Sequence, residues 1–167
     1  MAIARPLLSV LSLLLLAGGI VMTFFIVLSG SHIGSPVNHV YFLQAGTASI
    51  TGGNSNLHNP ARWTYLAICG VTGSLNSDCG HTKAVQSFDP SKNFGTSNGL
   101  PDSLVNSNYY WYMSRFTWVW YIIALFFAVC AFFLSLLALC TRLGAYLSGF
   151  TTLIACFFQA LAAAMMT

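Results

Sequence analysis

The sequence predicts an all-α transmembrane helical bundle that carries a small extracellular antiparallel β-sheet tied by a disulfide. Of the 167 residues, 56% are hydrophobic and only 5% are charged, whereas about a quarter of the residues of a soluble domain are charged. The apolar residues form three uncharged blocks, and the polar segment 31–115 separates the first block from the second. An ordinary soluble enzyme is therefore excluded. A net charge of +3 without a basic run also argues against a nucleic-acid-binding face.

Each apolar block is long enough to cross a membrane as a helix. Blocks of about 22–25 residues give roughly 33–37 Å of helix, and the hydrocarbon core is about 30 Å thick. In an open chain only helices satisfy their own backbone groups in lipid. The first block exceeds the apolar region of a secretory signal, which favours an uncleaved anchor. We expect a cytoplasmic N-terminus at 1–6, transmembrane helices at 7–30, 116–140 and 144–167, a loop domain at 31–115 and a cytoplasmic turn at 141–143.

Positive charge in the short segments predicts the orientation. Arg5 and Arg142 flank the spans on one side, and neither short segment carries an acid. The positive-inside rule therefore places the N-terminus and the 141–143 turn in the cytoplasm and the 31–115 loop outside. The third span then runs outward to Thr167. We expect the native chain to continue there with a fourth span and a tail.

The cysteines separate by environment. Cys69 and Cys79 are the one pair in the loop, and an extracytoplasmic loop meets oxidising conditions. Their spacing closes a small ring, so we predict a disulfide that contributes about 3 kcal/mol. A metal site that includes His81 is the alternative, but it lacks a clear fourth ligand. Cys140, at the expected cytoplasmic end of the second span, has a position typical of S-palmitoylation; an unmodified interfacial cysteine is the alternative.

Apolar and β-branched runs predict strands at 40–43 and 62–69, with a turn at 52–55 between them. In a continuous strand Trp63, Tyr65 and Ala67 would share one face, and we expect Trp63 to pack against the sheet. Residues 101–103 predict a helix start, capped by Asp102 or Ser103, that leads into the second span. The Tyr- and Trp-rich stretch 109–121 is typical of an outer membrane interface; a carbohydrate-stacking surface is the alternative.

Residues 95–99 fit the G-x-S-x-G pattern of hydrolases around Ser97. A nucleophile elbow needs a strand before the serine and a helix after it. The surrounding Ser, Asn and Gly residues favour a flexible loop instead. The four histidines and three aspartates of the loop show no spacing typical of a catalytic dyad. We therefore expect no catalytic residues, no metal and no cofactor.

The spans themselves carry few polar groups. They contain no charge, which disfavours a channel because intramembrane charges mark ion paths. Gln159 is the most polar side chain well inside a span, and an interhelical hydrogen bond is favoured over a place along a path. Ala160 and Ala164 have the small-xxx-small spacing at which membrane helices pack. They either hold the last two spans together or receive a fourth span or a partner's helix.

A series of short motifs resembles a known family. Leu28-Ser29-Gly30 ends the first span, residues 35–38 read SPVN and residues 41–44 read YFLQ. Arg62-Trp63-Thr64-Tyr65 then precedes the C-x(9)-C spacing, and Ser114-Arg115-Phe116 begins the second span. This order resembles the fungal SUR-seven/PalI family of four-span plasma-membrane proteins, which is similar in outline to the claudins. The resemblance covers the whole chain and is strongest at Arg62, Trp63 and Tyr65 with the two cysteines.

The resemblance implies a claudin-like fold and residence in static plasma-membrane furrows, the eisosomes. There the family is linked to membrane organisation, cell-wall integrity, endocytosis and sphingolipid balance, and its PalI branch to ambient-pH signalling. We therefore expect a non-enzymatic multi-span plasma-membrane protein that organises or scaffolds a membrane domain. The alternative is an accessory subunit of a larger membrane enzyme, pump or pH-sensing receptor complex. The expected partners are membrane lipids, with sterols and sphingolipids as candidates, and other integral membrane proteins through self-association or a larger complex, but no nucleic acid.

Overall fold

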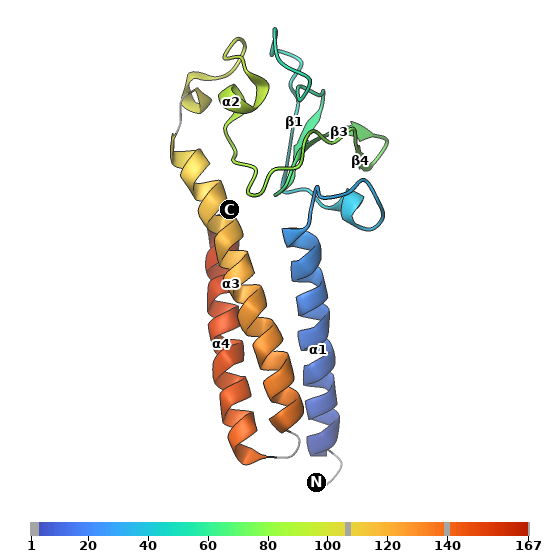
Figure 1. Ribbon diagram of the computed structural model, residues 1–167, viewed down its shortest axis with the longest axis vertical. Helices are drawn as coiled ribbons and strands as arrows, with labels where there is room; N and C mark the ends of the chain where they lie inside the picture. Colours follow the sequence, from blue (N-terminus) through green and yellow to red (C-terminus); the bar gives the residue numbers. More distant parts are fainter. Residues whose placement is uncertain (1–3, 106–107, 139–140, 167) are drawn as a thin grey trace. The chain divides into compact units, whose positions relative to one another are not determined.

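The computed structural model describes residues 4–105, 108–138 and 141–166. The chain divides into two compact units. Residues 1–24 and 119–167 form the helical unit, and residues 25–118 form the loop domain. Figure 1 shows the order of the elements along the chain, from helix α1 in blue to helix α4 in red.

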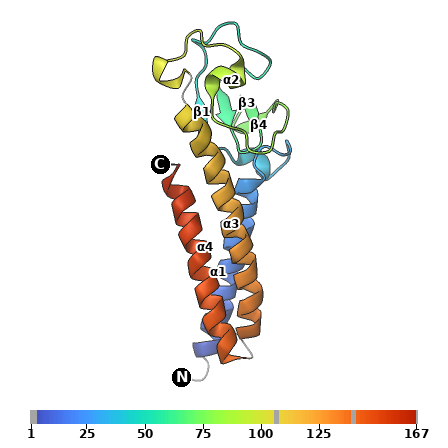
Figure 2. The same ribbon diagram turned by 60° about the vertical axis from the view of Figure 1, so that its left-hand side comes forward.

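Three long helices confirm the predicted transmembrane bundle. They are α1 (Ala4–Val27), α3 (Asn108–Ala138) and α4 (Arg142–Ala164). Within the part of the chain that the structure describes, the helices long and apolar enough to cross a membrane are Leu7–Val27, Asn108–Ala138 and Leu143–Ala164. Figure 2 shows α3 and α4 lying side by side. The hydroxyl of Thr141 accepts a hydrogen bond from the Gly144 N–H at 3.2 Å and so caps the start of α4.

The helix ends differ from the expected ones for local reasons. Helix α1 stops at Val27 and not at residue 30, because Gly30 takes a left-handed conformation (φ 82°) of the kind that ends helices. Helix α3 begins at Asn108, well before residue 116, because its aromatic first turns contain no helix breaker. The helix predicted from residues 101–103 is only the short 3₁₀ helix η2 (Asp102–Leu104). Its N-cap is Pro101, which makes no side-chain cap, and Val105 after it is extended.

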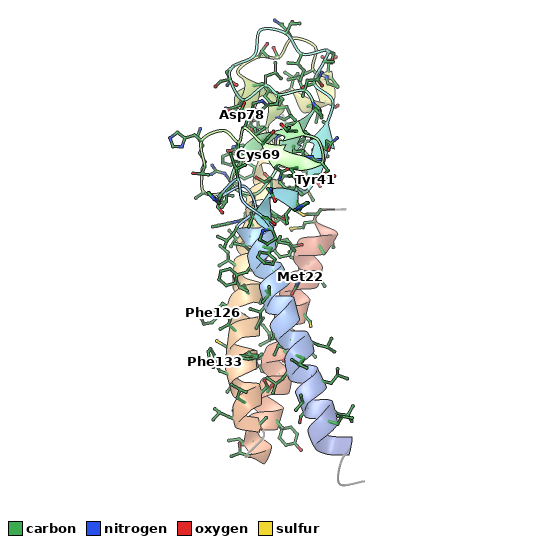
Figure 3. All side chains as sticks on the ribbon, turned by 90° about the vertical axis from the view of Figure 1, so that its right-hand side faces the viewer. Met22, Tyr41, Cys69, Asp78, Phe126 and Phe133 are labelled. Atoms are coloured by element: carbon green, nitrogen blue, oxygen red, sulfur yellow. A yellow bond between two sulfur atoms is a disulfide. The ribbon has the colours of Figure 1, made fainter. Side chains whose placement is uncertain are left out.

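Aromatic side chains join α3 and α4, and small side chains are buried within the helical unit. Phe158 of α4 stacks on Trp120 and Phe127 of α3, with ring centroids 5.2 and 6.1 Å apart. The buried alanines of the two helices are Ala124, Ala128, Ala131, Ala155 and Ala162. Small residues permit such close approach of helix backbones. Phe126 and Phe133 lie instead on the outer side of α3, where they are exposed (Figure 3).

The loop domain contains the predicted antiparallel sheet, with four strands in the order β1-β2-β3-β4. The strands are β1 (Leu43–Ala45), β2 (Ala61–Trp63), β3 (Ile68–Thr72) and β4 (Leu75–Ser77). Leu43 pairs with Trp63, and Trp63 pairs in turn with Ile68. The tight turn between β3 and β4 contains Gly73 with φ 64°, a conformation that glycine adopts without strain.

The prediction of one strand over 62–69 was wrong. The chain turns back between β2 and β3, and the side chain of Thr64 holds the turn. The Thr64 hydroxyl donates a hydrogen bond to the Ala67 carbonyl at 2.7 Å and accepts one from the Ala67 N–H at 3.1 Å. A β-branched, aromatic run is compatible with one long strand or with a hairpin, so the composition alone does not locate this turn.

A short helix that the sequence reading missed packs against the sheet. Helix α2 (Pro90–Phe94) has Asp89 as its N-cap, proline in its first turn and Gly95 with φ 70° after its end. This is the usual order of helix start and stop signals, compressed into one turn. Phe94 of α2 is fully buried with Ala61, Trp63 and Ile68 in the core of the loop domain.

Candidate functional site

Trp63 is the largest side chain of the loop-domain core and is only 2% exposed. Its ring meets the edges of Phe88 and Phe94, with centroids 5.3 and 5.6 Å away. Such edge-to-face pairs add to the burial of apolar area. The expectation that Trp63 packs against the sheet is confirmed. Its indole N–H makes no hydrogen bond within the described residues, so the role of the side chain is packing.

Arg62 lies on the opposite face of the sheet, because neighbouring side chains of a strand alternate between the two faces. It is buried, and no carboxylate of the described residues forms an ion pair with it. Its Nε donates a hydrogen bond to Gln44 Oε1 at 2.7 Å, and Nη1 donates to the Ser74 carbonyl at 2.9 Å and to Asn76 Oδ1 at 3.2 Å. The guanidinium carbon lies 4.1 Å from the centre of the Tyr41 ring, a favourable cation–π distance.

These contacts make Arg62 a structural centre that joins β1, the β3–β4 turn and the segment before β1. Asn76 extends the network, since its Nδ2 donates to the Val40 carbonyl at 3.0 Å. Removing the guanidinium would leave the buried Asn76 Oδ1 without this donor and would break two further, partly buried hydrogen bonds; a buried acceptor that loses its partner is the costly case for a hydrogen-bond network. An arginine at position 62 therefore serves the folding of the loop domain and not chemistry on a substrate.

Tyr65 does not share a face with Trp63, contrary to the single-strand prediction. It sits in the turn between β2 and β3, where its ring packs on Phe42 at 5.3 Å. Its backbone N–H donates to Ser29 Oγ at 3.1 Å, and its carbonyl accepts from the Gln86 N–H at 2.8 Å. The turn thus joins the segment after α1 to residues far along the loop.

Ser29 and Gly30 form the other side of that junction. The Ser29 carbonyl accepts from the Leu66 N–H at 3.1 Å, and Ser29 itself is buried. A Cβ added at Gly30 would overlap the Thr64 hydroxyl. The sequence showed Ser29 and Gly30 as part of a motif, but the reason for these residue types appears only when the 64–67 turn is placed against them.

The predicted disulfide between Cys69 and Cys79 is present. Cys69 lies in β3 opposite Arg62 and is fully buried. Because both thiols are consumed, the alternative metal site with His81 loses its sulfur ligands. The bond ties β3 to the segment after β4. Cys69 lies next to β2, the strand that carries Arg62 and Trp63.

Replacing both Cys69 and Cys79 with alanine is expected to lower the free energy of unfolding of the loop domain by about 3 kcal/mol, because the open ring has more freedom when unfolded. Denaturant unfolding of the full chain in detergent, followed by hydrogen exchange of loop-domain amides, measures this. Cys130→Ala, a free cysteine in α3, is the control and should leave loop exchange unchanged. Free-thiol labelling of both Cys69 and Cys79 in unreduced protein would refute the bond.

The G-x-S-x-G pattern is not a nucleophile elbow. Residues 95–99 follow helix α2 and precede no helix until η2. Ser97 lies in an exposed turn, where its carbonyl accepts from the Leu100 N–H at 3.2 Å. The one aspartate–histidine contact among the described residues joins His58 Nδ1 to the exposed Asp78 Oδ2 at 3.7 Å, which is longer than a hydrogen bond.

Asp89 caps α2 and pairs with Lys92. The carboxylate lies 2.9 Å from Lys92 Nζ and accepts from Ser91 Oγ at 2.8 Å and from the Lys92 N–H at 3.3 Å. Burial raises the pKa of Asp89, but the hydrogen bonds and charge of Lys92 and the Ser91 hydroxyl outweigh burial and hold the pKa below its ordinary value. A lowered pKa means that the stabilisation is complete above the unfolded pKa, near 4, and is lost as the pH falls through the folded one.

In the helical unit, Gln159 makes the interhelical hydrogen bond that its position suggested. Its Nε2 donates to Thr23 Oγ1 of α1 at 3.2 Å, and Thr23 donates to the Gly19 carbonyl at 2.8 Å. Ala160 and Ala164 are exposed, so they are not the residues through which α4 meets α3. Cys140 lies outside the described residues, and its palmitoylation stays a prediction.

Comparison with known proteins gives a consistent set of relatives. The sequence model described as the SUR7/PalI family matches residues 8–167. The chain is 35% identical over 130 residues to Protein SUR7 of Candida albicans, covering 77% of this chain and 46% of that protein. It is 34% identical to the SUR7 family protein FMP45 of Saccharomyces cerevisiae, covering 74% of this chain and 39% of the relative.

A third relative is named for its location. The chain is 32% identical to the uncharacterized plasma membrane protein YNL194C of Saccharomyces cerevisiae, covering 70% of this chain and 38% of the relative. The chain thus spans less than half the length of these relatives. No solved structure matches it.

Proposed function

The chain belongs to the SUR7/PalI family, and from this premise we propose that it is a non-enzymatic plasma-membrane protein that organises a membrane domain by lateral packing of its helices. In this proposal the N-terminus is cytoplasmic and the loop domain is an extracellular cap. Basic Arg5 and Arg142 support the orientation by the positive-inside rule, and the disulfide supports an oxidising location for the loop. An eisosome-type role is the form of this function that the family resemblance favours.

The observation that carries the proposal is the division of the small residues of α4 between two faces. Ala155 and Ala162 are buried within the helical unit, whereas Cys156, Ala160 and Ala164 are exposed. These three exposed residues recur every fourth position and so share one side of the helix. Helices in lipid associate where small residues let their backbones approach. This side of α4 is therefore suited to another helix, whether from a second copy, a partner or a further span.

Cross-linking through Cys156 tests the proposal, because this free cysteine lies on the same side of α4 as the two alanines. In a chain with Cys130 and Cys140 replaced by serine, mild oxidation of native membranes should join copies through Cys156. Replacing Ala160 and Ala164 together with leucine should reduce cross-linking and lateral clustering by about tenfold, since added bulk in a close contact costs about 1–3 kcal/mol and about 1.4 kcal/mol is tenfold in an association constant.

Gly18→Leu is the matched control for added bulk. Gly18 is exposed on α1, and a Cβ there meets nothing within 4 Å, so clustering should be unchanged. Intact clustering of a correctly inserted Ala160→Leu, Ala164→Leu chain would remove this face from the interface. Recovery of the native protein with one stoichiometric large membrane enzyme, pump or receptor would favour the accessory-subunit alternative over a scaffold.

A further inference from the structure

A polar cleft lies in the loop domain, away from the Arg62 and Trp63 network. It has a volume of about 140 Å³, which is room for about four or five waters at roughly 30 Å³ each. Three separate segments form its walls: residues 54–56, residues 80–86, and residues 92–93 of α2. Ile68 of β3 also contributes to the wall. The remaining lining side chains are basic or carry amides.

The charge of this cleft is not balanced. Of the three aspartates in the chain, Asp89 pairs with Lys92 at 2.9 Å and Asp78 contacts His58 at 3.7 Å. Neither Asp102 nor any other carboxylate lies within ion-pair distance of Lys83 in the described parts of the chain. Asp89 offsets much of the charge of Lys92, so the net positive charge of the cleft rests on Lys83.

The wall formed by residues 80–86 is fixed by hydrogen bonds to the turn between β2 and β3. The Lys83 N–H donates to the Leu66 carbonyl and the Gln86 N–H to the Tyr65 carbonyl, both at 2.8 Å. Between them Val85 has φ 59°, a conformation that a β-branched residue adopts only under strain. Strain of this kind persists where the surrounding structure enforces it, and it concentrates at binding sites.

Asn93 orders the amide groups of the cleft. Its side-chain Oδ1 accepts from Gln86 Nε2 at 3.0 Å, and its carbonyl accepts from Asn54 Nδ2 at 3.0 Å. The side chain of Asn56 makes no hydrogen bond that the described residues show, and it lies against Gly80. The cleft wall therefore carries the exposed residue Lys83 together with neutral amide side chains.

We propose that this cleft binds a phosphate-type oxyanion, either free or as a phosphomonoester on a glycan or a lipid headgroup. Lysine binds phosphate as a point charge, and amide N–H groups complete such sites as neutral donors. The volume suits one phosphate group, with the glycan or lipid that carries it lying outside the cleft. The proposal does not depend on lateral packing of the helices, because every residue involved lies in the loop domain.

Titration of the isotope-labelled full chain in detergent tests the site. Inorganic phosphate, added against chloride at constant ionic strength, should shift the backbone amides of Lys83, Gln86 and Asn93 in a saturable way. Lys83→Ala should weaken binding by about tenfold, as expected for loss of a charge-assisted hydrogen bond. Among the described residues Lys83 makes its hydrogen bond through the backbone N–H, so this variant should keep its loop-domain spectrum.

Arg115→Gln is the matched control, because it removes one positive charge outside the cleft. Mannose 6-phosphate, and vesicles of phosphatidylcholine with or without phosphatidylinositol 4-phosphate, distinguish the sources. Shifts with either soluble phosphate assign a free or glycan-borne group, and shifts with phosphoinositide vesicles alone assign a headgroup; both support the site. Absence of saturable shifts with all three probes, or equal weakening by Lys83→Ala and Arg115→Gln, would overturn it.

Discussion

Trp63→Ala is expected to lower the free energy of unfolding of the loop domain by about 3–5 kcal/mol, the usual cost of deleting a fully buried aromatic side chain. The indole contacts two rings, and Trp63 is paired across the sheet with Leu43 and Ile68. Its loss leaves a cavity that Ala61 and Phe94, themselves fully buried, are poorly placed to fill. Hydrogen exchange of the amides of β1 and β3 in the full-length protein should rise accordingly.

Trp63→Phe separates packing from polarity. The indole N–H has no hydrogen-bond partner within the described residues, so phenylalanine gives up part of the packing but no hydrogen bond. We therefore expect a loss of about 1–2 kcal/mol, well below that of Trp63→Ala. Equal destabilisation by both variants would show that the N–H matters. An unchanged exchange rate in Trp63→Ala would contradict its place in the core.

The parts of the fold that depend on composition were predictable from the sequence. The three spans follow from the length and apolarity of their blocks, and the Cys69–Cys79 bond follows from the one cysteine pair outside them. The interhelical bond of Gln159 is similar, because an amide inside a span has few other ways to be satisfied. In each case one strong physical requirement leaves a single solution.

The parts that depend on contacts between distant segments were not predictable. The turn at Thr64 interrupts a run that is compatible with one long strand, and it places Tyr65 away from Trp63. The exposure of Ala160 and Ala164 depends on which side of α4 meets α3, and the alternation of small residues permits either side. The cleft beside Lys83 is built from three segments whose spacing in sequence carries no motif.

The residue type at Gly30 also depends on a contact between distant segments, and its replacement has the second large expected effect. Its φ of 82° lies in the left-handed region, where a Cβ costs about 1–2 kcal/mol. The added methyl would also overlap the Thr64 hydroxyl, which already makes two hydrogen bonds with Ala67. Overpacking of a tight contact adds about 1–3 kcal/mol. Gly30→Ala is therefore expected to lower the free energy of unfolding of the loop domain by about 2–5 kcal/mol.

Two other glycines of the loop domain separate these causes. Gly73 has φ 64°, but a Cβ there meets nothing within 4 Å, and Gly46 has neither a positive φ nor a close neighbour. Gly73→Ala should cost only the conformational part, about 1–2 kcal/mol, and Gly46→Ala should be close to neutral. The Tyr65 and Leu66 amides donate to Ser29, so their hydrogen-exchange rates measure the stability of this junction directly. If Gly30→Ala lowered the free energy of unfolding no more than Gly73→Ala does, the overlap of the added methyl with Thr64 would cost nothing. Backbone conformation alone would then set the junction after α1.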